Sequence, residues 1–589
     1  MIWQYNLLLF FVLWWGGYSI YLSFNHGLAP NARLQQLLRY LAASVCAVIP
    51  LGVTKTSPLQ PTLLLVLGIA VLWMMTYPLI YHLTHRKAAP DYDHQMDVAF
   101  GIYLFGWLSA WVIGLPAWGW IVGLIAFCLL FLIVAQWVYY LIYDTVIDAT
   151  GLAPILETDY NEAIEYLRSY SPVRVVGVVV LVLSLAVGCL YVPLHWKVQV
   201  GMTTWWTLAV CAALFLFISV YLWKPHHGIF IRTGIASLYQ EVQDYVTKNR
   251  QYITEQHQRL ADLQVTSVTP PLIHPHTLIM VIGESASRDY MSAFTDMDVQ
   301  TTPWLDSLKA DSAHCILFPH AYSCDIQTVP VLEKALTEYN QYDGGAFFQS
   351  CSIVDVAQKL GYRVHWFSNQ GYLGAADTPI TLVANTADRA KWTHQELNQV
   401  QYDGTLANFL ADVDPAKNNL VIFHLMGSHF NYENRFPADF RLWGTGHDHE
   451  LNYKHTLRYT DYVLQQFFET ARERLNLQGM VYFSDHADVP NRHRVPNFGG
   501  YRDTRIPLVV WLGDEYIAQK PHRFKALQDN RLSYWTNDLL YELMCGLMDA
   551  HSNHFHEKNS LTSSMYQFTR ETLTAMNGKV RIADDGYPQ

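Results

Sequence analysis

Charged side chains are scarce in the first 223 residues of this 589-residue sequence, which contain only 8 Lys or Arg and 9 Asp or Glu. The other 366 residues contain the remaining 72 charged side chains, a proportion that is ordinary for a globular domain. The first part is therefore too apolar to be a soluble domain, and the chain divides into two parts of different chemistry.

Cysteine is also rare, and no block of basic residues occurs. Eight cysteines exclude a small disulfide-stapled scaffold. A formal net charge of −11 without a basic cluster argues against a nucleic-acid-binding protein. The sequence contains no low-complexity tract and no internal repeat, and 51% of its residues are hydrophobic, which excludes a disordered chain.

The first part is rich in hydrophobic runs that are long enough to cross a bilayer, roughly 17–25 residues each. The runs lie near residues 2–24, 37–53, 61–83, 98–114, 117–145, 173–194 and 203–223. We predict a transmembrane domain of five to seven helices over residues 1–223. The first run has neither a positive start nor a small-residue cleavage site, so we interpret it as a retained anchor.

The number of spans decides the orientation. Seven spans with a cytoplasmic N-terminus would place everything after residue 223 outside the cytoplasm. The run at 37–53 is the weakest, and its loss would reverse this result. The positive-inside rule helps little, because Arg86 and Lys87 would then lie outside.

Two polar segments have alternative interpretations. Residues 157–168 concentrate acidic groups at helical spacing, which fits a solvated loop helix or a rim that faces lipid headgroups. Residues 224–275 form a predicted amphipathic linker, in which apolar residues recur on one helical face at Ile235, Leu238, Val242 and Tyr245. This helix could lie on the membrane surface or pack against the following domain.

From residue 276 to 589 short β-rich runs alternate with amphipathic helices. The predicted strands are 277–282, 363–367, 419–425, 480–483 and 506–512, and the predicted helices are near 329–340, 352–360, 453–474 and 533–548. This alternation predicts an α/β domain with a mostly parallel central sheet that is covered by helices on both faces.

Metal-binding residue types follow three of the predicted strands. Glu284 follows the first, His429 follows 419–425, and Asp485-His486 follows 480–483, with His493 a little further on. Ligands bind beyond the carboxyl ends of strands in such sheets, so these side chains should meet at one rim. Carboxylates and imidazoles suit zinc or manganese. The coincidence at three strand ends predicts a metal site.

A hydroxyl nucleophile has two candidates. Ser285 is adjacent to Glu284, but neighbours on an extended segment point to opposite faces, so Ser285 should point away from the metal. Thr328 is favoured because it stands where a helix begins, with Pro330 in the first turn. Helix N-termini favour bound phosphate. The alternative interpretation of Thr328 is a simple N-cap residue.

Six motifs resemble those of a known family. They are VIGESASRDYMSAF (281–294), TTPWLD (301–306), TVPVLEKALTEYN (328–340), WFSNQGYLGAADTP (366–379), HLMGSHFNYENRFP (424–437) and YFSDHAD (482–488). The soluble part resembles the alkaline-phosphatase/sulfatase superfamily. The whole chain resembles bacterial phosphoethanolamine transferases, in particular those that modify lipopolysaccharide.

This resemblance implies a site. Glu284, Thr328, Asp485 and His486 would hold one tightly bound zinc ion, and Thr328 would become phosphoethanolaminated. The further residues that match the family would contact substrate or, for the histidines, a second zinc: His429, His493, Asn369 and, in the acidic loop, Glu162.

The resemblance also implies the reaction and its place. Phosphoethanolamine would pass from phosphatidylethanolamine to a lipopolysaccharide core sugar or lipid A, which would favour resistance to cationic peptides. We expect a monomeric, multi-pass protein of the bacterial inner membrane, with its catalytic domain over 276–589 in the periplasm. The family commonly has five spans. A disulfide of Cys324 with Cys351 or Cys315 would suit an oxidising compartment, but the pairing, including Cys545, stays open.

Alternative activities share much of this pattern. A phosphoglycerol transferase or a zinc-dependent lipid phosphodiesterase would use the same metal site, whereas a non-catalytic relative would lack metal. A type I sulfatase is disfavoured, because the segment that begins at Cys324 lacks the Pro or Ala and the Arg that its maturation requires.

Overall fold

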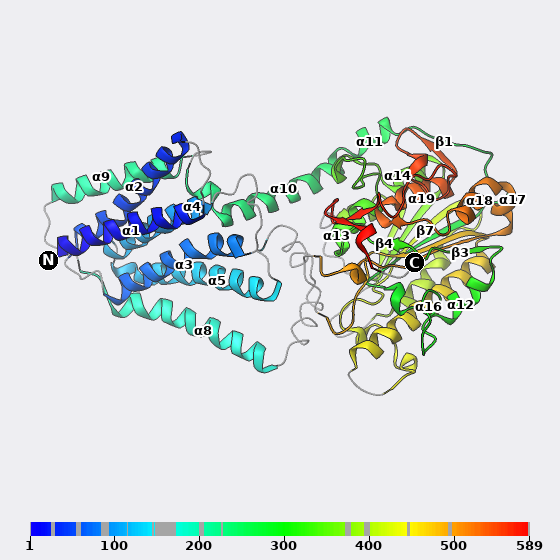
Figure 1. Cartoon of the computed structure of the whole chain (residues 1–589), viewed down its shortest axis with the longest axis horizontal. Coiled ribbons are helices and arrows are strands. Elements are labelled where there is room, and N and C mark those ends of the chain that lie inside the picture. The colour runs from blue at the N-terminus through cyan, green and yellow to red at the C-terminus, as the bar shows by residue number, and fades with distance from the viewer. Residues whose placement is uncertain are drawn as a thin grey trace. The chain divides into compact units, whose positions relative to one another are not determined.

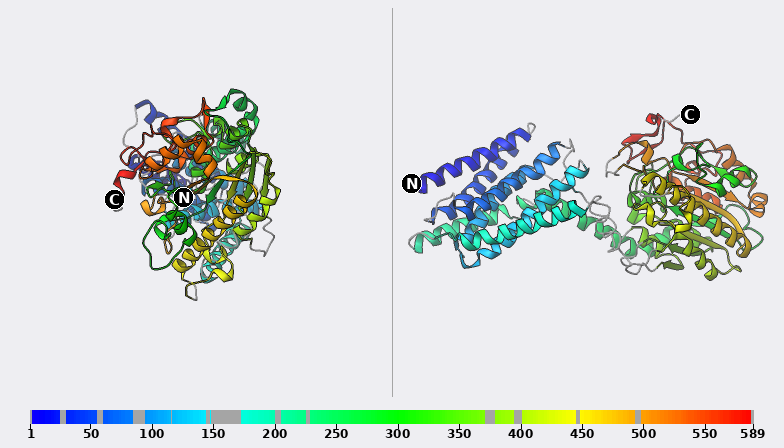
Figure 2. Two further views of the ribbon diagram at one scale, coloured as in Figure 1. Left: turned by 90° about the vertical axis from the view of Figure 1, so that its right-hand side faces the viewer. Right: turned by 90° about the horizontal axis from the view of Figure 1, so that it is seen from below.

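A computed structural model of the chain describes residues 2–24, 30–54, 60–83, 94–114, 116–143, 147, 172–199, 205–224, 228–370, 379–393, 401–444, 448–492 and 498–586. These residues fall into two compact units (Figures 1 and 2), one within residues 1–154 and 170–245 and one that contains residues 246–589.

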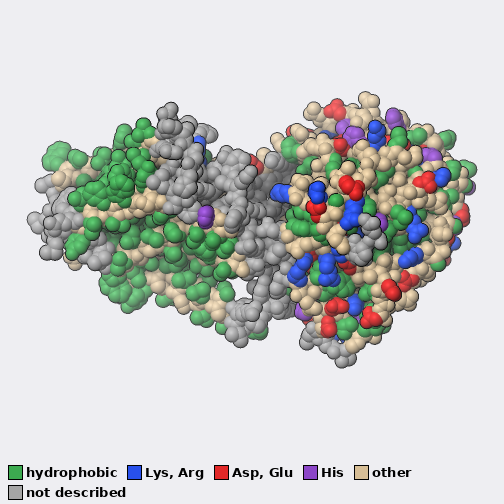
Figure 3. Space-filling view, in the orientation of Figure 1, with side chains coloured by type: hydrophobic (Ala, Val, Ile, Leu, Met, Phe, Trp, Pro, Cys, Tyr) green, Lys and Arg blue, Asp and Glu red, His purple; other side chains and the backbone are tan. Residues whose placement is uncertain are grey.

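The first unit is built from apolar helices. They are α1 (Ile2–Phe24), α2 (Pro30–Gly52), α3 (Pro61–Leu83), α4 (His94–Gly114), α5 (Gly119–Tyr143), α8 (Pro172–His195) and α9 (Trp205–Leu222). Hydrophobic side chains dominate the face of these helices that Figure 3 shows. Among the described residues five stretches are long and apolar enough to cross a membrane: Leu34–Gly52, Pro61–Ile80, Gln95–Gly114, Gly119–Leu141 and Val176–His195. The apolar stretches Tyr5–Ile20 and Trp206–Leu222 are shorter.

Close backbone approach and one buried carboxylate organise this unit. A Cβ atom on Gly106 of α4 would lie 2.3 Å from the carbonyl oxygen of Cys46 on α2, so only glycine permits this contact. Asp97 of α4 accepts hydrogen bonds from Nε1 of Trp73 at 3.0 Å and from the backbone N–H of Gly234 at 2.9 Å. The carboxylate thereby holds the first residue of α10 (Gly234–Thr254).

The second unit contains a seven-stranded sheet in the order β3-β9-β8-β2-β7-β5-β6. The strands are β2 (Thr277–Gly283), β3 (Cys315–Leu317), β5 (Arg363–Ser368), β6 (Arg389–Trp392), β7 (Asn419–His424), β8 (Leu477–Ser484) and β9 (Leu508–Leu512). Neighbouring strands from β8 to β6 pair in parallel, whereas β9 pairs antiparallel with β8 and with β3. The predicted α/β domain with a mostly parallel sheet is confirmed.

Every residue of β2, β7 and β8 is buried, which explains why these strands read as continuous apolar runs. Alternate residues of β2 enter different cores. Leu278, Met280 and Ile282 pack on one face of the sheet, and Ile279 and Val281 pack on the other. Side chains of a strand alternate between its faces, so one strand serves both layers.

Helices cover both faces of the sheet, as Figure 1 shows. The first core contains residues of α13 (Thr328–Ala335), α14 (Ile353–Lys359), α15 (Pro379–Ala384) and α19 (Leu540–Leu547). The second core contains residues of α12 (Pro303–Ala310) and α16 (His449–Arg474). The predicted helix at 329–340 is shorter in the structure, and the one at 533–548 begins later.

All eight cysteines lie among the described residues, and all are free thiols. The expected disulfide of Cys324 with Cys351 or Cys315 is therefore wrong for this structure. Cys315 belongs to β3 and packs in the second core, while Cys324 and Cys351 pack in the first. The sheet thus separates Cys315 from the other two.

Candidate functional site

Four side chains meet where β2 and β8 end and α13 begins. The hydroxyl of Thr328 donates to Oε2 of Glu284 across 3.3 Å, and its oxygen lies 3.4 Å from Nε2 of His486. Nε2 of His486 in turn lies 3.4 Å from Oε1 of Glu284 and 3.2 Å from Oδ2 of Asp485. The ligand atoms of Glu284, Asp485 and His486 all lie within 4.8 Å of one another.

The orientation of His486 fits a cation. Its Nδ1 lies 3.1 Å from the carbonyl oxygen of Ala487, which can only accept a hydrogen bond. We therefore assign the ring proton of the neutral imidazole to Nδ1, and Nε2 then directs a lone pair at the oxygens of Glu284, Asp485 and Thr328. A histidine that binds zinc commonly donates its other N–H to such a carbonyl.

The two carboxylates lie where an unpaired charge is costly. Asp485 is fully buried and Glu284 is 1% exposed. Burial opposes ionisation of Asp485, but the adjacent His486 and the N–H groups of Ser285 and His486 prevail and lower its pKa. These N–H groups donate to Oδ1, while Oδ2 accepts no hydrogen bond from the described residues. A divalent cation would satisfy Oδ2, and the site's donor set is the one that zinc prefers.

Ser285 corrects one expectation. Its backbone is not extended but left-handed, with φ of 57°. The hydroxyl therefore turns back and donates to Oε1 of Glu284 at 2.7 Å, while the backbone N–H donates to Asp485. Ser285 thus orients both carboxylates instead of pointing away from them.

Thr328 is the first helical residue of α13, and Gln327 is the N-cap. The interpretation of Thr328 as a simple N-cap is therefore wrong. The first helical hydrogen bond of α13 runs from Val331 N–H to the carbonyl of Gln327, so the preceding N–H groups have no partner within the helix. Thr328 is half-buried, whereas its three neighbours in the site are buried. Thr328 is thus the one of these four residues that is not buried.

The loop after β7 lies directly against Glu284. The N–H of Ser428 donates to the carbonyl of Glu284 at 2.9 Å. Gly427 has φ of +52°, and a Cβ atom there would lie 2.7 Å from the carbonyl oxygen of Glu284. His429 follows this turn and is half-buried. It does not belong to the group of metal-ligand atoms that the described residues form around Glu284.

Asn369 and Asp403 support this loop from behind. Nδ2 of Asn369 donates to Oδ1 of Asp403 at 2.8 Å, and Oδ1 of Asn369 accepts from Thr393. Asp403 also accepts from the backbone N–H groups of Met426 and Gly427, both at 2.8 Å. Nothing in the sequence indicated a role for Asp403, because this residue follows no predicted strand and belongs to none of the six motifs. A role of Asn369 in substrate binding stays a prediction.

Arg435 is directed at the same loop. Its Nη2 donates to the carbonyl of Phe430 at 2.8 Å, and its Nε donates to that of His429 at 3.3 Å. Two further predicted residues, Glu162 and His493, lie outside the described residues, as does the acidic segment 157–168.

Two family models match the chain. The model described as "Sulfatase" matches residues 276–544, and the one described as "Phosphoethanolamine transferase EptA/EptB" matches residues 106–233. The phosphoethanolamine transferase EptC of Escherichia coli (strain K12) is 26% identical over 467 residues, which are 72% of this chain and 78% of that protein.

Two solved structures resemble the fold. The integral membrane protein lipooligosaccharide phosphoethanolamine transferase A from Neisseria meningitidis aligns with a TM-score of 0.55 at 17% identity, over 85% of this chain and 98% of its own. The C-terminal periplasmic domain of E. coli EptC, solved as a complex with Zn, aligns with a TM-score of 0.50 at 21% identity. The alignment covers 55% of this chain and 96% of that domain.

Matches to both parts of the chain agree with the fold described above. The second unit has the sulfatase type of α/β fold, and the described part of the first contains five apolar helices of membrane-spanning length. The resemblance found in the sequence motifs is confirmed. Both parts of the chain are similar to phosphoethanolamine transferases, and the chain is a transferase enzyme.

Proposed function

We propose that the enzyme transfers phosphoethanolamine from phosphatidylethanolamine to lipopolysaccharide, at a core sugar or lipid A, through a covalent ester on Thr328. The observation that carries this proposal is the position of the Thr328 hydroxyl, 3.3 Å from Glu284 and 3.4 Å from His486 at the start of α13. A glycolipid acceptor is supported by the N. meningitidis protein with a similar fold, which is a lipooligosaccharide phosphoethanolamine transferase.

Glu284, Thr328, Asp485 and His486 would hold one zinc ion. Zinc bound there lowers the pKa of a coordinated hydroxyl and neutralises charge on phosphate oxygens. The proposal assigns His429 and His493 to the transferred phosphate or to a second zinc, and Asn369 to substrate contact. The zinc complex of the E. coli relative's domain supports the choice of metal.

The first half-reaction joins Oγ1 of Thr328 to phosphorus and breaks the bond between phosphorus and the glycerol oxygen. The glycerol oxygen leaves with the electron pair and gains a proton, which balances the proton lost by Thr328. Diacylglycerol is released. In the second half-reaction an acceptor oxygen bonds to the same phosphorus and the bond between phosphorus and Oγ1 of Thr328 breaks. Thr328 regains the proton that the acceptor hydroxyl loses. The N–H groups at the start of α13 face the charge on the phosphate oxygens.

A membrane domain in the same chain would allow a two-tailed donor to react without leaving the bilayer. The proposal places a monomeric enzyme in the bacterial inner membrane with the catalytic domain in the periplasm. Residues 1–223 form the membrane domain, 224–275 the linker and 276–589 the catalytic domain. Glu162, in the acidic loop, would approach the lipid headgroup.

The test uses the full-length protein in detergent, supplied with zinc and phosphatidylethanolamine and then analysed by intact mass and peptide mapping. We expect a phosphoethanolamine adduct on the peptide that contains Thr328, which disappears when lipopolysaccharide is added. A glycerol phosphate adduct would indicate a phosphoglycerol transferase. Release of diacylglycerol and free phosphoethanolamine without need of an acceptor would indicate a phosphodiesterase. An adduct on another residue would refute the role of Thr328.

A further inference from the structure

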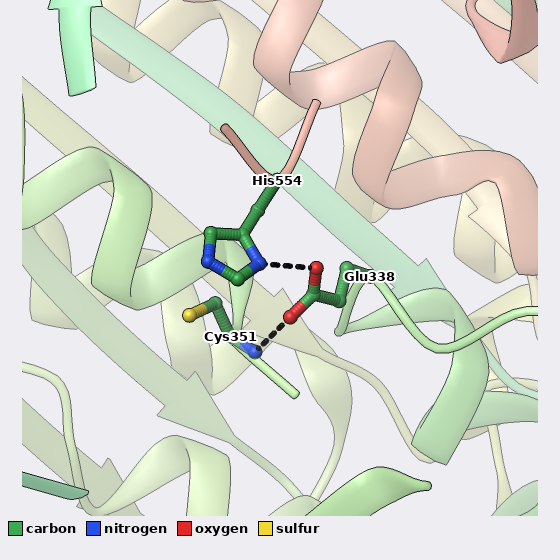
Figure 4. A group of neighbouring side chains, drawn as sticks. All are labelled: Glu338, Cys351 and His554. Atoms are coloured by element: carbon green, nitrogen blue, oxygen red, sulfur yellow. Dashed lines mark hydrogen bonds and ion pairs between the residues drawn. The ribbon is translucent and has the colours of Figure 1, made fainter. Parts of the chain in front are cut away.

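A second group of metal-binding side chains lies apart from Thr328 and its neighbours. Glu338 follows α13, Cys351 precedes α14, and His554 follows β11 (Ala550–Ser552) (Figure 4). One ligand atom from each residue lies within 4.8 Å of the others. Glu338 and Cys351 are 13 residues apart, but His554 lies more than 200 residues further along the chain, so tertiary packing brings it to the other two.

The backbone fixes two of these residues before any metal binds. Thr337 and Ser352 form an antiparallel bridge, which places the residues beside them opposite each other. The N–H of Glu338 donates to the carbonyl of Cys351 at 3.0 Å, and the N–H of Cys351 donates to Oε1 of Glu338 at 2.9 Å. The Glu338 carboxylate is therefore held beside the cysteine by its own backbone partner.

The imidazole of His554 is fixed by the same carboxylate. Its Nδ1 lies 2.6 Å from Oε2 of Glu338. A metal ion between Nδ1 and the Glu338 carboxylate would bind both groups once the ring proton moves to Nε2, and the sulfur of Cys351 lies within reach of the same ion.

The sulfur of Cys351 lies at the edge of the first core, beside two polar groups. The residue is 1% exposed, and its sulfur makes no hydrogen bond with the described residues. Burial first, and the charge of Glu338 next, raise the pKa of this thiol to about 12. A thiol that only filled space would gain nothing from a carboxylate and an imidazole beside it, whereas a metal ion would bind all three groups.

We infer that Glu338, Cys351 and His554 form a second zinc site, which takes the ion through a thiolate, an imidazole and a carboxylate. This ligand set is typical of zinc. Binding breaks the S–H bond of Cys351, forms a bond between sulfur and the metal, and releases the proton to solvent. The side chains of Glu338 and His554 are 18% and 25% exposed, which leaves room for a water molecule as the fourth ligand.

The site has a structural consequence for the catalytic helix. Thr328 begins α13 and Glu338 stands three residues after its end, so the two sites lie at opposite ends of a helix about 12 Å long. An ion bound to Glu338 ties the end of α13 to the start of α14 and to the C-terminal segment at His554. The inference does not depend on the proposed role of Thr328.

Cobalt replaces zinc for the test, because a thiolate bound to Co²⁺ gives a charge-transfer absorption in the near ultraviolet. The site around Thr328 contains no sulfur, so this absorption reports only on Cys351. We expect the full-length protein, freed of metal and then loaded with Co²⁺, to show the absorption. Cys351→Ala should abolish it, and His554→Gln should weaken or abolish it. Cys315→Ala, which removes another buried free thiol, and Asp485→Asn should both retain it.

Zinc content measured by mass spectrometry after dialysis gives a second readout. We expect Cys351→Ala to lose one zinc ion per chain relative to Cys315→Ala. Absence of the thiolate–cobalt absorption in the unmodified protein would overturn the inference, whatever the variants do. Persistence of the absorption in Cys351→Ala would overturn it as well. A failure of the Thr328 proposal would appear separately, as a missing adduct with the cobalt absorption intact.

Discussion

The hydroxyl of Thr328 donates a hydrogen bond to Oε2 of Glu284 at 3.3 Å, although 44 residues separate them in the chain. The contact joins the end of β2 to the start of α13. It places the half-buried hydroxyl between a buried carboxylate and the lone pair of His486.

Replacement of Thr328 by alanine should abolish transfer, because the proposed ester forms on Oγ1 of Thr328. We expect Thr328→Ala to retain zinc and its unfolding temperature, since Glu284, Asp485 and His486 remain. Activity with lipopolysaccharide and adduct mass provide the measurement. Ser285→Ala is the matched control, as it removes the other hydroxyl that contacts Glu284. Transfer that survives in Thr328→Ala and fails in Ser285→Ala would reverse the assignment.

Replacement of Asp485 by asparagine should remove zinc from the catalytic site. Loss of a residue that hydrogen-bonds to a metal ligand weakens metal binding roughly 10–100-fold. We expect the loss of a ligand itself to weaken zinc binding by more than this. Zinc content after dialysis measures the effect. The control is Asp403→Asn, another buried carboxylate, which supports the loop before His429 and contacts no metal ligand. It should lower kcat and keep the zinc. Equal metal loss in both variants would contradict the assigned ligand set.

Replacement of Gly427 by alanine should displace Glu284. The new Cβ atom would lie 2.7 Å from the carbonyl oxygen of Glu284, in addition to the strain of φ at +52°. Gly344→Ala is a close control, because Gly344 has φ of +76° with open space around it. We expect about 1–2 kcal/mol of destabilisation from φ in both variants. Gly427→Ala should lose about 1–3 kcal/mol more from overpacking and should lose activity. Equal stability and equal activity of the Gly427→Ala and Gly344→Ala variants would show that the contact with Glu284 is unimportant.

Asp461 should make stability depend on pH. Burial raises its pKa from 3.8 to about 7. Hydrogen bonds from the backbone N–H groups of Trp304 and Leu305 lower the pKa, but their effect is smaller than that of burial. Because the folded protein holds this proton more tightly than the unfolded chain, the stabilisation is full below about pH 4. It is lost as pH rises through about 7.

Relative to Asp461→Asn, the unmodified protein should therefore lose free energy of unfolding between these pH values, by at most about 4 kcal/mol. Thermal or denaturant unfolding across this pH range provides the measurement. Asp298→Asn, at a side chain that is 82% exposed, controls for the loss of one carboxyl group. Identical pH profiles of the unmodified protein and Asp461→Asn would refute the prediction.

Much of the fold follows from local sequence. Fully buried parallel strands must be continuously apolar, so β2, β7 and β8 could be located from composition, and bilayer thickness fixes the length of the membrane helices. The order of parallel strands places their carboxyl ends at one rim. That rule alone indicated that Glu284 and the Asp485-His486 pair would meet, before any contact was known.

Other features depend on partners that are distant in the chain, and local patterns carry no information about them. The antiparallel β9 takes its direction from β8 and β3. Ser285 adopts a left-handed backbone because its N–H and hydroxyl find Asp485 and Glu284. Asp403 becomes important only because the loop at Gly427 folds onto it.

The sequence by itself thus determined the division into an apolar part and a globular part. It also determined the fold type of the globular part and the strand ends that carry Glu284 and His486. Tertiary structure alone decided which oxygens face Nε2 of His486, and it alone brought Cys351 within reach of His554. The physical reason is the distance along the chain over which each effect acts. The hydrophobic periodicity that sets burial extends over a few residues and is therefore visible in the local sequence. Hydrogen-bond and metal-ligand geometry requires atoms placed within a few tenths of an ångström, and packing between remote segments sets those positions.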